Sequence, residues 1–382
     1  MAQMIEMRKT WGETMLELTK THPNLMVLDG DLGNSTMAQT VAYNAPDFYM
    51  NMGIAEQNMM GVAAGMASVG LIPWLSSFAC FLANRDLDQL RVTVAQPSLS
   101  VKMAGHYSGI LTGKTGKTHI DVEDIAILRA LPHMTVVAPA DSVECRQAII
   151  TLTDMPGPAY LRLTRDASPV IFGDDYRFVL GRVVPLREGK DLTIFGTGVQ
   201  TTRALEACDL LAAGGISAHL VHVPTLKPID VVGIVAAARK TGRVLTTEDH
   251  NIIGGLGGAV AEVLGQHHPV PMKIHGLQDR FGESGPNDPM LEKYGLTPKH
   301  IVAAAKTLLK HHPPARHATP AKRQAPVKKA TPARARVVSK KRHTRFKCDW
   351  SSDVVLFRSV FLISPSVNVS ERQSSPGAVK LS

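Results

Sequence analysis

The sequence predicts an α/β protein made of two parallel-sheet domains in succession, followed by a basic tail. Short apolar runs typical of buried parallel strands alternate with helical segments along residues 1–166, and again along residues 189–310. A hydrophobic share of 44% with 31 glycines suits helices that lie close on a sheet. Between the two units, residues 167–188 are rich in Pro, Gly and Asp, which predicts a linker.

The order of the elements follows from the apolar pattern. Met7, Trp11, Met15 and Leu18 recur at helical spacing and predict a first helix within residues 1–20. In the first unit we further expect strands at 25–28, 71–74, 99–103, 135–139 and 159–163, and helices after Glu56 and at 82–96, 121–130 and 141–152. In the second unit we expect strands at 191–196, 217–222, 243–247 and 271–275, and helices at 200–213, 230–239, 256–265 and 298–309.

The composition changes sharply after Leu309, and residues 311–382 are predicted to be disordered. Residues 316–347 contain twelve Lys or Arg and no Asp or Glu; removing these twelve charges from the net charge of +9 leaves −3 for the remainder. The tail is therefore either a nonspecific contact for polyanions or a solvated segment without a partner. Residues after about 340 resemble translated sequencing-adapter reads, so we expect them not to be native.

The cysteines and the apolar runs indicate in which cellular compartment the protein is expected. The four cysteines lie far apart and form no CxxC pair, which argues against a structural zinc site and a disulfide framework. No apolar run approaches the roughly 20 residues that cross a bilayer, and no secretory signal is visible at the start of the chain. We expect a cytoplasmic protein.

One carboxylate stands in a run that otherwise looks buried. Glu56 lies in Gly53-Ile54-Ala55-Glu56-Gln57-Asn58, directly before a run of small and apolar residues that predicts a tightly packed helix. A buried carboxylate is either neutral or has a dedicated partner.

The Gly-rich stretch 105–118 does not match the motif of a phosphate-binding P-loop. Ser108 and Leu111 stand at the positions where that motif needs glycine.

Further motifs follow Glu56 in a characteristic order: Phe78 and Phe81 about 20 residues on, His106 in a Gly-rich loop, and His119 at the end of that loop. This order resembles the pyrimidine-binding domain of the transketolase family. The second unit, with Thr246-Thr247-Glu248-Asp249-His250 and Gly254-Gly255-Leu256-Gly257, resembles the transketolase C-terminal domain. The resemblance covers residues 5–310 and lacks the family's N-terminal domain, so the chain looks like the second subunit of a split transketolase.

This resemblance implies a thiamine diphosphate cofactor. Glu56 would hydrogen-bond N1′ of the pyrimidine ring and favour the tautomer that activates the thiazolium C2, in a site whose apolar walls keep the acid protonated or sharing its proton. Phe78 and Phe81, three residues apart on a helical turn, would pack on the pyrimidine, and Asp31 would also contact the cofactor. The diphosphate and a Mg²⁺ or similar ion would be held by the partner subunit, and this chain would contribute no metal ligand.

The resemblance also implies a site for a phosphorylated sugar. Arg8, Ser35, His106 and Arg165 match the family's positions for the sugar phosphate, and two arginines, a hydroxyl and an imidazole suit a phosphate dianion. His119 matches the histidine near the reacting carbons and would be catalytic, together with Glu56.

The loop before His119 departs from the family pattern. It is one residue longer, counted from His106, and Thr115 replaces the Asp that reads a sugar hydroxyl, with Lys114 beside it. This puts the usual pentose and hexose phosphates in doubt and points to a more anionic or modified ketose.

The function expected from the resemblance is transfer of a two-carbon ketol group between phosphorylated sugars, by a heterotetramer with paired sites between subunits. Two alternatives stay open. One is a reaction like that of 1-deoxyxylulose-5-phosphate synthase or of a 2-oxoacid dehydrogenase β subunit. The other is a non-catalytic partner subunit whose tail binds polyanions.

Overall fold

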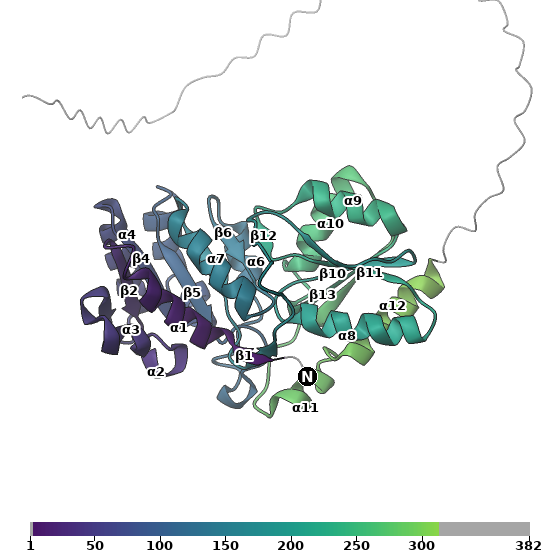
Figure 1. Cartoon of the computed structure of the whole chain (residues 1–382), viewed down its shortest axis with the longest axis horizontal. Coiled ribbons are helices and arrows are strands. Elements are labelled where there is room, and N and C mark those ends of the chain that lie inside the picture. Colours follow the sequence, from purple (N-terminus) through teal and green to yellow (C-terminus); the bar gives the residue numbers. More distant parts are fainter. Residues whose placement is uncertain (1–2, 313–382) are drawn as a thin grey trace, which may run out of the picture. The chain divides into compact units, whose positions relative to one another are not determined.

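The described part of the chain contains two large sheets in which parallel strand pairs predominate (Figure 1). The structure, a computed structural model, describes residues 3–312. The first sheet has seven strands in the order β12-β6-β7-β5-β4-β2-β3, and the second has five in the order β14-β13-β10-β11-β9. The edge strands β12 and β9 are antiparallel to their neighbours. The prediction of two parallel-sheet α/β units is confirmed.

The first unit begins with a short strand and continues in strand–helix alternation. Its strands are β1 (Met4–Glu6), β2 (Leu25–Asp29), β3 (Tyr49–Asn51), β4 (Ile72–Phe78), β5 (Lys102–His106), β6 (Thr135–Val137), β7 (Ala159–Arg162) and β8 (Ala167–Pro169). Its helices are α1 (Met7–Leu18), α2 (Gly33–Thr36), α3 (Gln39–Asn44), α4 (Glu56–Ser68), α5 (Leu87–Gln89), α6 (Asp124–Ala130) and α7 (Ser142–Asp154). Two π-helical segments, Phe81–Arg85 and Leu90–Ala95, flank α5.

The second unit repeats the alternation with fewer strands. Its strands are β9 (Val184–Arg187), β10 (Leu192–Gly196), β11 (Ala218–His222), β12 (Thr225–Lys227), β13 (Val244–Asn251) and β14 (Met272–Leu277). Its helices are α8 (Gln200–Ala213), α9 (Val231–Thr241), α10 (Leu256–His267), α11 (Asn287–Lys293) and α12 (Pro298–His311). Figure 1 shows α9 and α10 on one face of this sheet and α8 and α12 on the other.

Each predicted helix and strand has a counterpart, with three informative differences. The strand predicted at 99–103 is β5, which starts at Lys102 and reaches His106. Lys102 can lie inside this strand, without exposed surface, because its ammonium donates to Met155 O at 2.8 Å and Gly157 O at 2.6 Å. The expected linker, residues 167–188, carries β8, which pairs with β1, and β9, which extends the second sheet.

The third difference is β12, which no pattern predicted. It follows β11 in the chain but pairs with β6 and so completes the first sheet. A strand from the later unit is therefore part of the earlier unit's sheet. The predicted domain boundaries (1–166, 167–188 and 189–310) stay predictions, and the predicted tail lies outside the described residues from 313 onward.

The first sheet is covered on both faces by buried helices. Trp11 and Met15 of α1 have no exposed surface and pack in one apolar cluster with α7. Met59 and Met60 of α4 are equally buried and belong to a second cluster, which continues into the second unit through residues of α9 and α10. Burial on both faces explains why these strands are apolar runs rather than alternating ones.

The strands that precede the predicted site residues end at one edge. β2, β4, β5 and β7 are adjacent and parallel, and their last residues are nearly in register: Asp29 lies opposite Ser76, Phe78 opposite His106, and Gly105 opposite Arg162. The loops that follow these strands therefore meet along the carboxyl edge of the first sheet, where ligands of open α/β sheets bind.

Two further observations concern membrane-spanning helices and cysteines. Residues 3–312 include no helix with the length and apolar character needed to cross a membrane. In the same residues, Cys80, Cys145 and Cys208 are free thiols.

A buried carboxylate anchors the start of α10. Glu248 of β13 is fully buried, and its two oxygens accept the backbone N–H groups of Leu256 at 2.6 Å and Gly257 at 2.8 Å. These are donors that a helix leaves unpaired at its first turn. Burial raises the pKa of Glu248 to about 7, against the opposing effect of the two hydrogen bonds.

This pKa makes stability depend on pH. Between about pH 4.5 and 7 the folded chain keeps a proton that the unfolded chain has released, so the free energy of unfolding should fall as pH rises through this window. The loss attributable to Glu248 is on the order of 3 kcal/mol. Urea denaturation at about pH 5 and about pH 7.5 should show this difference in the native protein and lose it in Glu248→Gln. The control Glu206→Gln, at an exposed carboxylate of α8, should keep it; equal pH slopes for all three proteins would contradict the assignment.

Candidate active site

Glu56 is the first residue of α4, and only 1% of it is exposed. The Ser77 hydroxyl donates to Glu56 Oε1 at 3.3 Å. A side chain added at Gly30 would meet Ser77 Oγ at 3.1 Å and Glu56 Oε1 at 3.7 Å, so the backbone after β2 lies directly against this carboxylate. Glu56 is buried as the sequence predicted, in a wall formed by the ends of β2 and β4.

The partner of Glu56 is a cation rather than the apolar enclosure that the resemblance implied. Arg85 Nη1 lies 2.6 Å from Glu56 Oε2, and the Arg85 guanidinium lies 4.1 Å above the centre of the Phe81 ring. Phe81 and Arg85 are the two ends of one π-helical segment, a rare geometry that is frequent at functional sites. Sequence reasoning assigned no role to Arg85, although the run Arg85-Asp86-Leu87-Asp88-Gln89 could have indicated it.

A second buried carboxyl group lies near Glu56. Asp86 has no exposed surface, and neither of its oxygens has a hydrogen-bond partner among the described residues. Burial, reinforced by the charge of Glu56, raises the pKa of Asp86 well above its usual range. Asp86 is therefore favoured in the neutral form.

Aromatic rings form the next part of the site. Phe78 and Phe81 stack with centroids 5.9 Å apart, and His119 meets them edge-on at 5.8 Å and 5.3 Å. Phe78 is the last residue of β4 and not part of a helical turn, so the turn after the strand brings the two rings together. The Thr118 hydroxyl lies 2.8 Å from His119 Nδ1 and orients the imidazole.

Tyr107 joins these rings to the basic residues. Its ring stacks on Phe78 at 4.1 Å, and the Arg165 guanidinium lies 5.4 Å from its centre. Its backbone has φ of 61°, a left-handed conformation that a bulky residue rarely adopts and that is concentrated at functional sites. Sequence reasoning missed Tyr107, and only its position next to His106 could have pointed to it.

His106 differs from the prediction in its location. It is the last residue of β5 rather than a loop residue, has no exposed surface, and meets the Trp11 ring edge-on at 5.0 Å. Burial, with a smaller contribution from the charge of Arg8, lowers its pKa to about 3, so the imidazole is neutral. Neither ring nitrogen has a partner among the described residues.

Two other predicted substrate residues lie in the first turn of α1 and in α2. Arg8 donates to the backbone oxygen of Ser35 at 2.9 Å and pairs with Glu6 at 3.1 Å. The Ser35 hydroxyl bonds to Asn34. Asp31, predicted to contact the cofactor, is exposed, has φ of 63°, and accepts a hydrogen bond from Asn51 at 3.0 Å. Arg8 and Ser35 are thus brought together, with Arg8 also close enough to His106 to affect its pKa.

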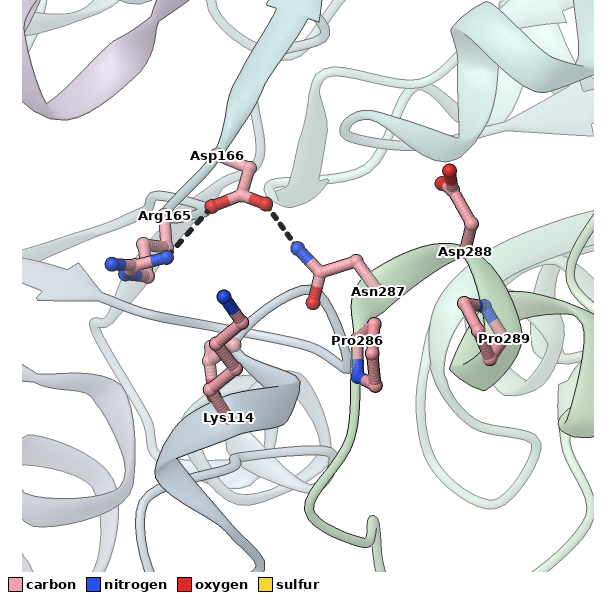
Figure 2. A pocket seen from close by; sticks show the side chains of 8 residues that line it. Lys114, Arg165, Asp166, Pro286, Asn287, Asp288 and Pro289 are labelled. Carbon is pink, nitrogen blue, oxygen red and sulfur yellow. Dashed lines mark hydrogen bonds and ion pairs between the residues drawn. The ribbon is translucent and has the colours of Figure 1, made fainter.

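Arg165 lies apart from this group, in a polar pocket of about 320 Å³ shown in Figure 2. Asp166 pairs with Arg165 at 3.1 Å and also accepts a hydrogen bond from Asn287 of the second unit. The Lys114 side chain reaches toward the same group of residues (Figure 2). The full lining is Thr112, Lys114, Arg165, Asp166, Pro286, Asn287, Asp288 and Pro289.

The two sheets, with a buried carboxylate and stacked rings at the carboxyl edge of the first, form the architecture of the pyrimidine-binding half of a thiamine diphosphate enzyme. The chain belongs to the transketolase family: residues 3–170 match the family model "Transketolase, pyrimidine binding domain", and residues 181–301 match "Transketolase, C-terminal domain". The family uses thiamine diphosphate, and its members are transferases.

Several similar relatives are single subunits of about the length of the folded part of this chain. A 6-deoxy-6-sulfo-D-fructose transketolase subunit from Clostridium sp. is 41% identical over 78% of this chain and 93% of that protein. An apulose-4-phosphate transketolase subunit from Phocaeicola vulgatus is 36% identical over 80% of this chain and 98% of that protein. A solved structure, "Split gene transketolase, inactive beta4 tetramer", is 44% identical over 80% of this chain and 98% of that one, with a TM-score of 0.74.

The donor set of the described residues fits a pyrimidine ring better than a metal ion. Residues 3–312 contain no cluster of three or more His, Cys, Asp or Glu side chains that could hold a metal. The buried carboxylate of Glu56 offers an oxygen to a ring nitrogen, and the stacked Phe78 and Phe81 offer apolar faces to a ring.

The pairing of Glu56 with Arg85 predicts a measurable coupling. Because the carboxylate is buried, removing Arg85 leaves a charge without its partner, whereas removing both charges does not. We expect a double-mutant cycle with Glu56→Gln and Arg85→Gln to give a coupling free energy of about 1–3 kcal/mol in urea denaturation. The side chain of Arg85 is 41% exposed, which favours the lower end of that range.

An exposed pair on the following turn serves as the matched control. Asp88 and Arg91 lie 3.7 Å apart with side chains 77% and 64% exposed. The cycle Asp88→Asn with Arg91→Gln should give less than about 0.5 kcal/mol. A Glu56–Arg85 coupling no larger than this control would show that the two side chains are not paired in solution.

Proposed function

We propose that this chain is the pyrimidine-binding subunit of a split transketolase, and that with an N-terminal partner subunit it transfers a two-carbon ketol group from an anionic ketose to an aldose. The observation that carries the proposal is the buried Glu56 beside the stacked Phe78 and Phe81, with His119 edge-on to both rings. The family membership of the whole folded part supports it.

In this proposal Glu56, Phe78 and Phe81 hold the cofactor's pyrimidine. The Glu56 carboxyl hydrogen-bonds N1′, Ser77 and the backbone at Gly30 keep it in place, and the two phenyl rings pack on the heterocycle. When bound, thiamine diphosphate supplies a nucleophilic carbon at C2 of its thiazolium ring. Asp31, on the exposed loop after β2, lies at the rim of the same edge.

His119 is the residue proposed to handle protons on the sugar. Thr118 occupies its Nδ1 at 2.8 Å, so Nε2 is the nitrogen available to a substrate hydroxyl. An imidazole in this position can accept a proton from one hydroxyl oxygen and return it to another as the carbon–carbon bond breaks and forms.

The partner subunit is proposed to hold the diphosphate and its divalent ion, in a heterotetramer with paired sites in the cytoplasm. The solved relative is described as a split gene transketolase whose beta4 tetramer is inactive. That description suits a chain which carries pyrimidine-binding and C-terminal domains and needs another chain for activity.

The substrate is proposed to be a ketose with a terminal phosphate or sulfonate. Arg165 and Lys114 bring two cations to the pocket of Figure 2, and Arg8 with the neutral His106 and Ser35 supplies further donors along the same edge. Tetrahedral anions are bound by such mixed sets of charged and neutral donors. The two relatives are described with a sulfo-ketose and a ketose phosphate, which fits this class.

Glu56→Gln tests the proposal in the complex reconstituted with the N-terminal subunit. Because Gln lacks the proton-sharing carboxyl group, kcat/KM for ketol transfer should fall by a factor on the order of 10²–10⁴, with subunit association in gel filtration unchanged. The control Asp88→Asn, at an exposed carboxylate, should keep full activity.

The chain alone gives the second comparison in this experiment. It should show no turnover until the partner subunit is added. Near-native activity of Glu56→Gln in the complex would overturn the proposed role of Glu56. Full activity of the chain by itself would overturn the proposed need for a partner subunit. A complex that assembles but turns over no ketose would favour the non-catalytic alternative.

Lys114→Met tests the substrate class. Loss of one cation should raise KM for a ketose phosphate or sulfonate about tenfold and leave KM for the corresponding uncharged ketose unchanged. Lys117→Met is the matched control, since Lys117 is exposed on the same loop and does not line the pocket. Equal KM values for Lys114→Met and the native complex would remove Lys114 from the substrate site.

A further inference from the structure

The loop between β5 and α6 contacts the second unit along its length, including a hydrogen bond from the Asn251 N–H to the Val122 oxygen at 2.8 Å. Three further contacts bear on the position of its middle part. At its start, the Asp249 carboxylate of β13 contacts Gly109 and Ile110. At its middle, a side chain added at Gly116 would lie 2.6 Å from Ser284 Oγ. At its end, Ile120 packs so closely on Gly282 that an added Cβ there would meet it at 2.8 Å.

The contact at Asp249 is the most specific of the three. Asp249 is 2% exposed, and its Oδ1 accepts the backbone N–H of Ile110 at 3.0 Å. Gly109 has φ of 73°, and a Cβ at this residue would lie 2.2 Å from Asp249 Oδ2. The Asp249 carboxylate therefore fills the space that the side chain of any other residue at position 109 would need, so the contact requires glycine there.

Asp249 is itself held from the first unit. Its backbone oxygen accepts Arg162 Nη2 at 2.8 Å, and Arg162 Nε pairs with Asp124 Oδ2 at 2.9 Å. Arg162 and Asp124 are buried, so their ion pair is shielded from water. The ion pair, with the bond from Arg162 to Asp249, fixes β13 against the end of β7. The position of the Asp249 carboxylate is determined by both sheets.

The loop held in this way carries two site residues. Tyr107 precedes the Asp249 contact and stacks between Phe78 and Arg165, while His119 follows the Ser284 contact and meets Phe78 and Phe81. A shift of the loop would move His119 relative to the rings. A displacement near 1 Å at a catalytic group can lower the rate on the order of 10²-fold.

We propose that Asp249 is a positioning residue through which the C-terminal domain sets the place of the substrate loop 107–119, and with it His119. It acts through the loop and does not touch the reacting atoms. Its effect on turnover rests on the proposed function, whereas its effect on the loop does not.

Hydrogen–deuterium exchange of the full chain tests the effect on the loop. Asp249→Ala removes the acceptor of the Ile110 N–H, and exchange in residues 107–119 should rise about tenfold, with α4 and β2 unchanged. Asp249→Asn keeps an acceptor oxygen and should restore most of the protection. Gly109→Ala, which disturbs the same contact from the loop side, should reproduce the effect of Asp249→Ala.

A buried contact between the units that lies away from the loop provides the control. His222 Nε2 and Glu144 Oε2 are 2.7 Å apart, and neither side chain is exposed. His222→Gln should lower thermal stability without increasing exchange in residues 107–119. This separates loop positioning from general weakening of the contact between the units.

Activity of the reconstituted complex completes the test. Asp249→Ala should lower kcat for ketol transfer about tenfold or more, with rescue by Asp249→Asn and no change in His222→Gln. Unchanged loop exchange in both Asp249→Ala and Gly109→Ala would overturn the proposal, as would raised exchange with native kcat. If the native complex turns over no ketose, the proposed function fails, and the exchange measurement alone decides whether Asp249 positions the loop.

Discussion

The buried ion pair of Arg162 with Asp124 is the interaction on which both halves of the fold depend. It joins the end of β7 to the start of α6, and Arg162 extends it to the backbone of β13 in the second unit. Tyr160 adds a hydroxyl to Asp124 at 2.7 Å. Two charges taken out of water are tolerated only when each is fully paired, so the relative placement of these three elements is narrowly restricted. The loop that carries His119 begins and ends within reach of this network.

The carboxyl edge of the first sheet concentrates groups that are costly to bury elsewhere. Glu56 is paired with Arg85, Asp86 is favoured as a neutral acid, and His106 is kept neutral by burial. The backbone of Tyr107 is strained in the same region. Such a concentration is typical of a site that trades stability for function. Along this edge, the stacked rings of Phe78 and Phe81 lie near Glu56 and Arg85, whereas Lys114 and Arg165 line a separate polar pocket.

The sequence predicted most elements because their pattern is local. The helix beginning at Glu56 and the strand–helix order of both units follow from apolar periodicity, which can be recognised in a single sequence. Apolar periodicity did not predict the strands β9 and β12, whose hydrogen-bonding partners lie far away in the sequence. β12 and β9 form because each pairs with the edge of a sheet, in antiparallel orientation. The strand predicted at 99–103 lies at Lys102–His106 because these residues pair in register with β4, and the first four of them with β7.

The sequence by itself determined the family and the α/β class, because residue types and their order along the chain carry that information. It also predicted Glu56, Phe78, Phe81 and His119 as a set, and their roles stay a proposal. Only the tertiary structure decided how Glu56 is satisfied, that His106 ends a buried strand, and that Tyr107 links the rings to Arg165. It also decided that Asp249, which is 139 residues from Ile110 along the chain, lies against the loop that carries His119. Contacts between side chains far apart in sequence depend on how two sheets pack, and no local pattern encodes that packing.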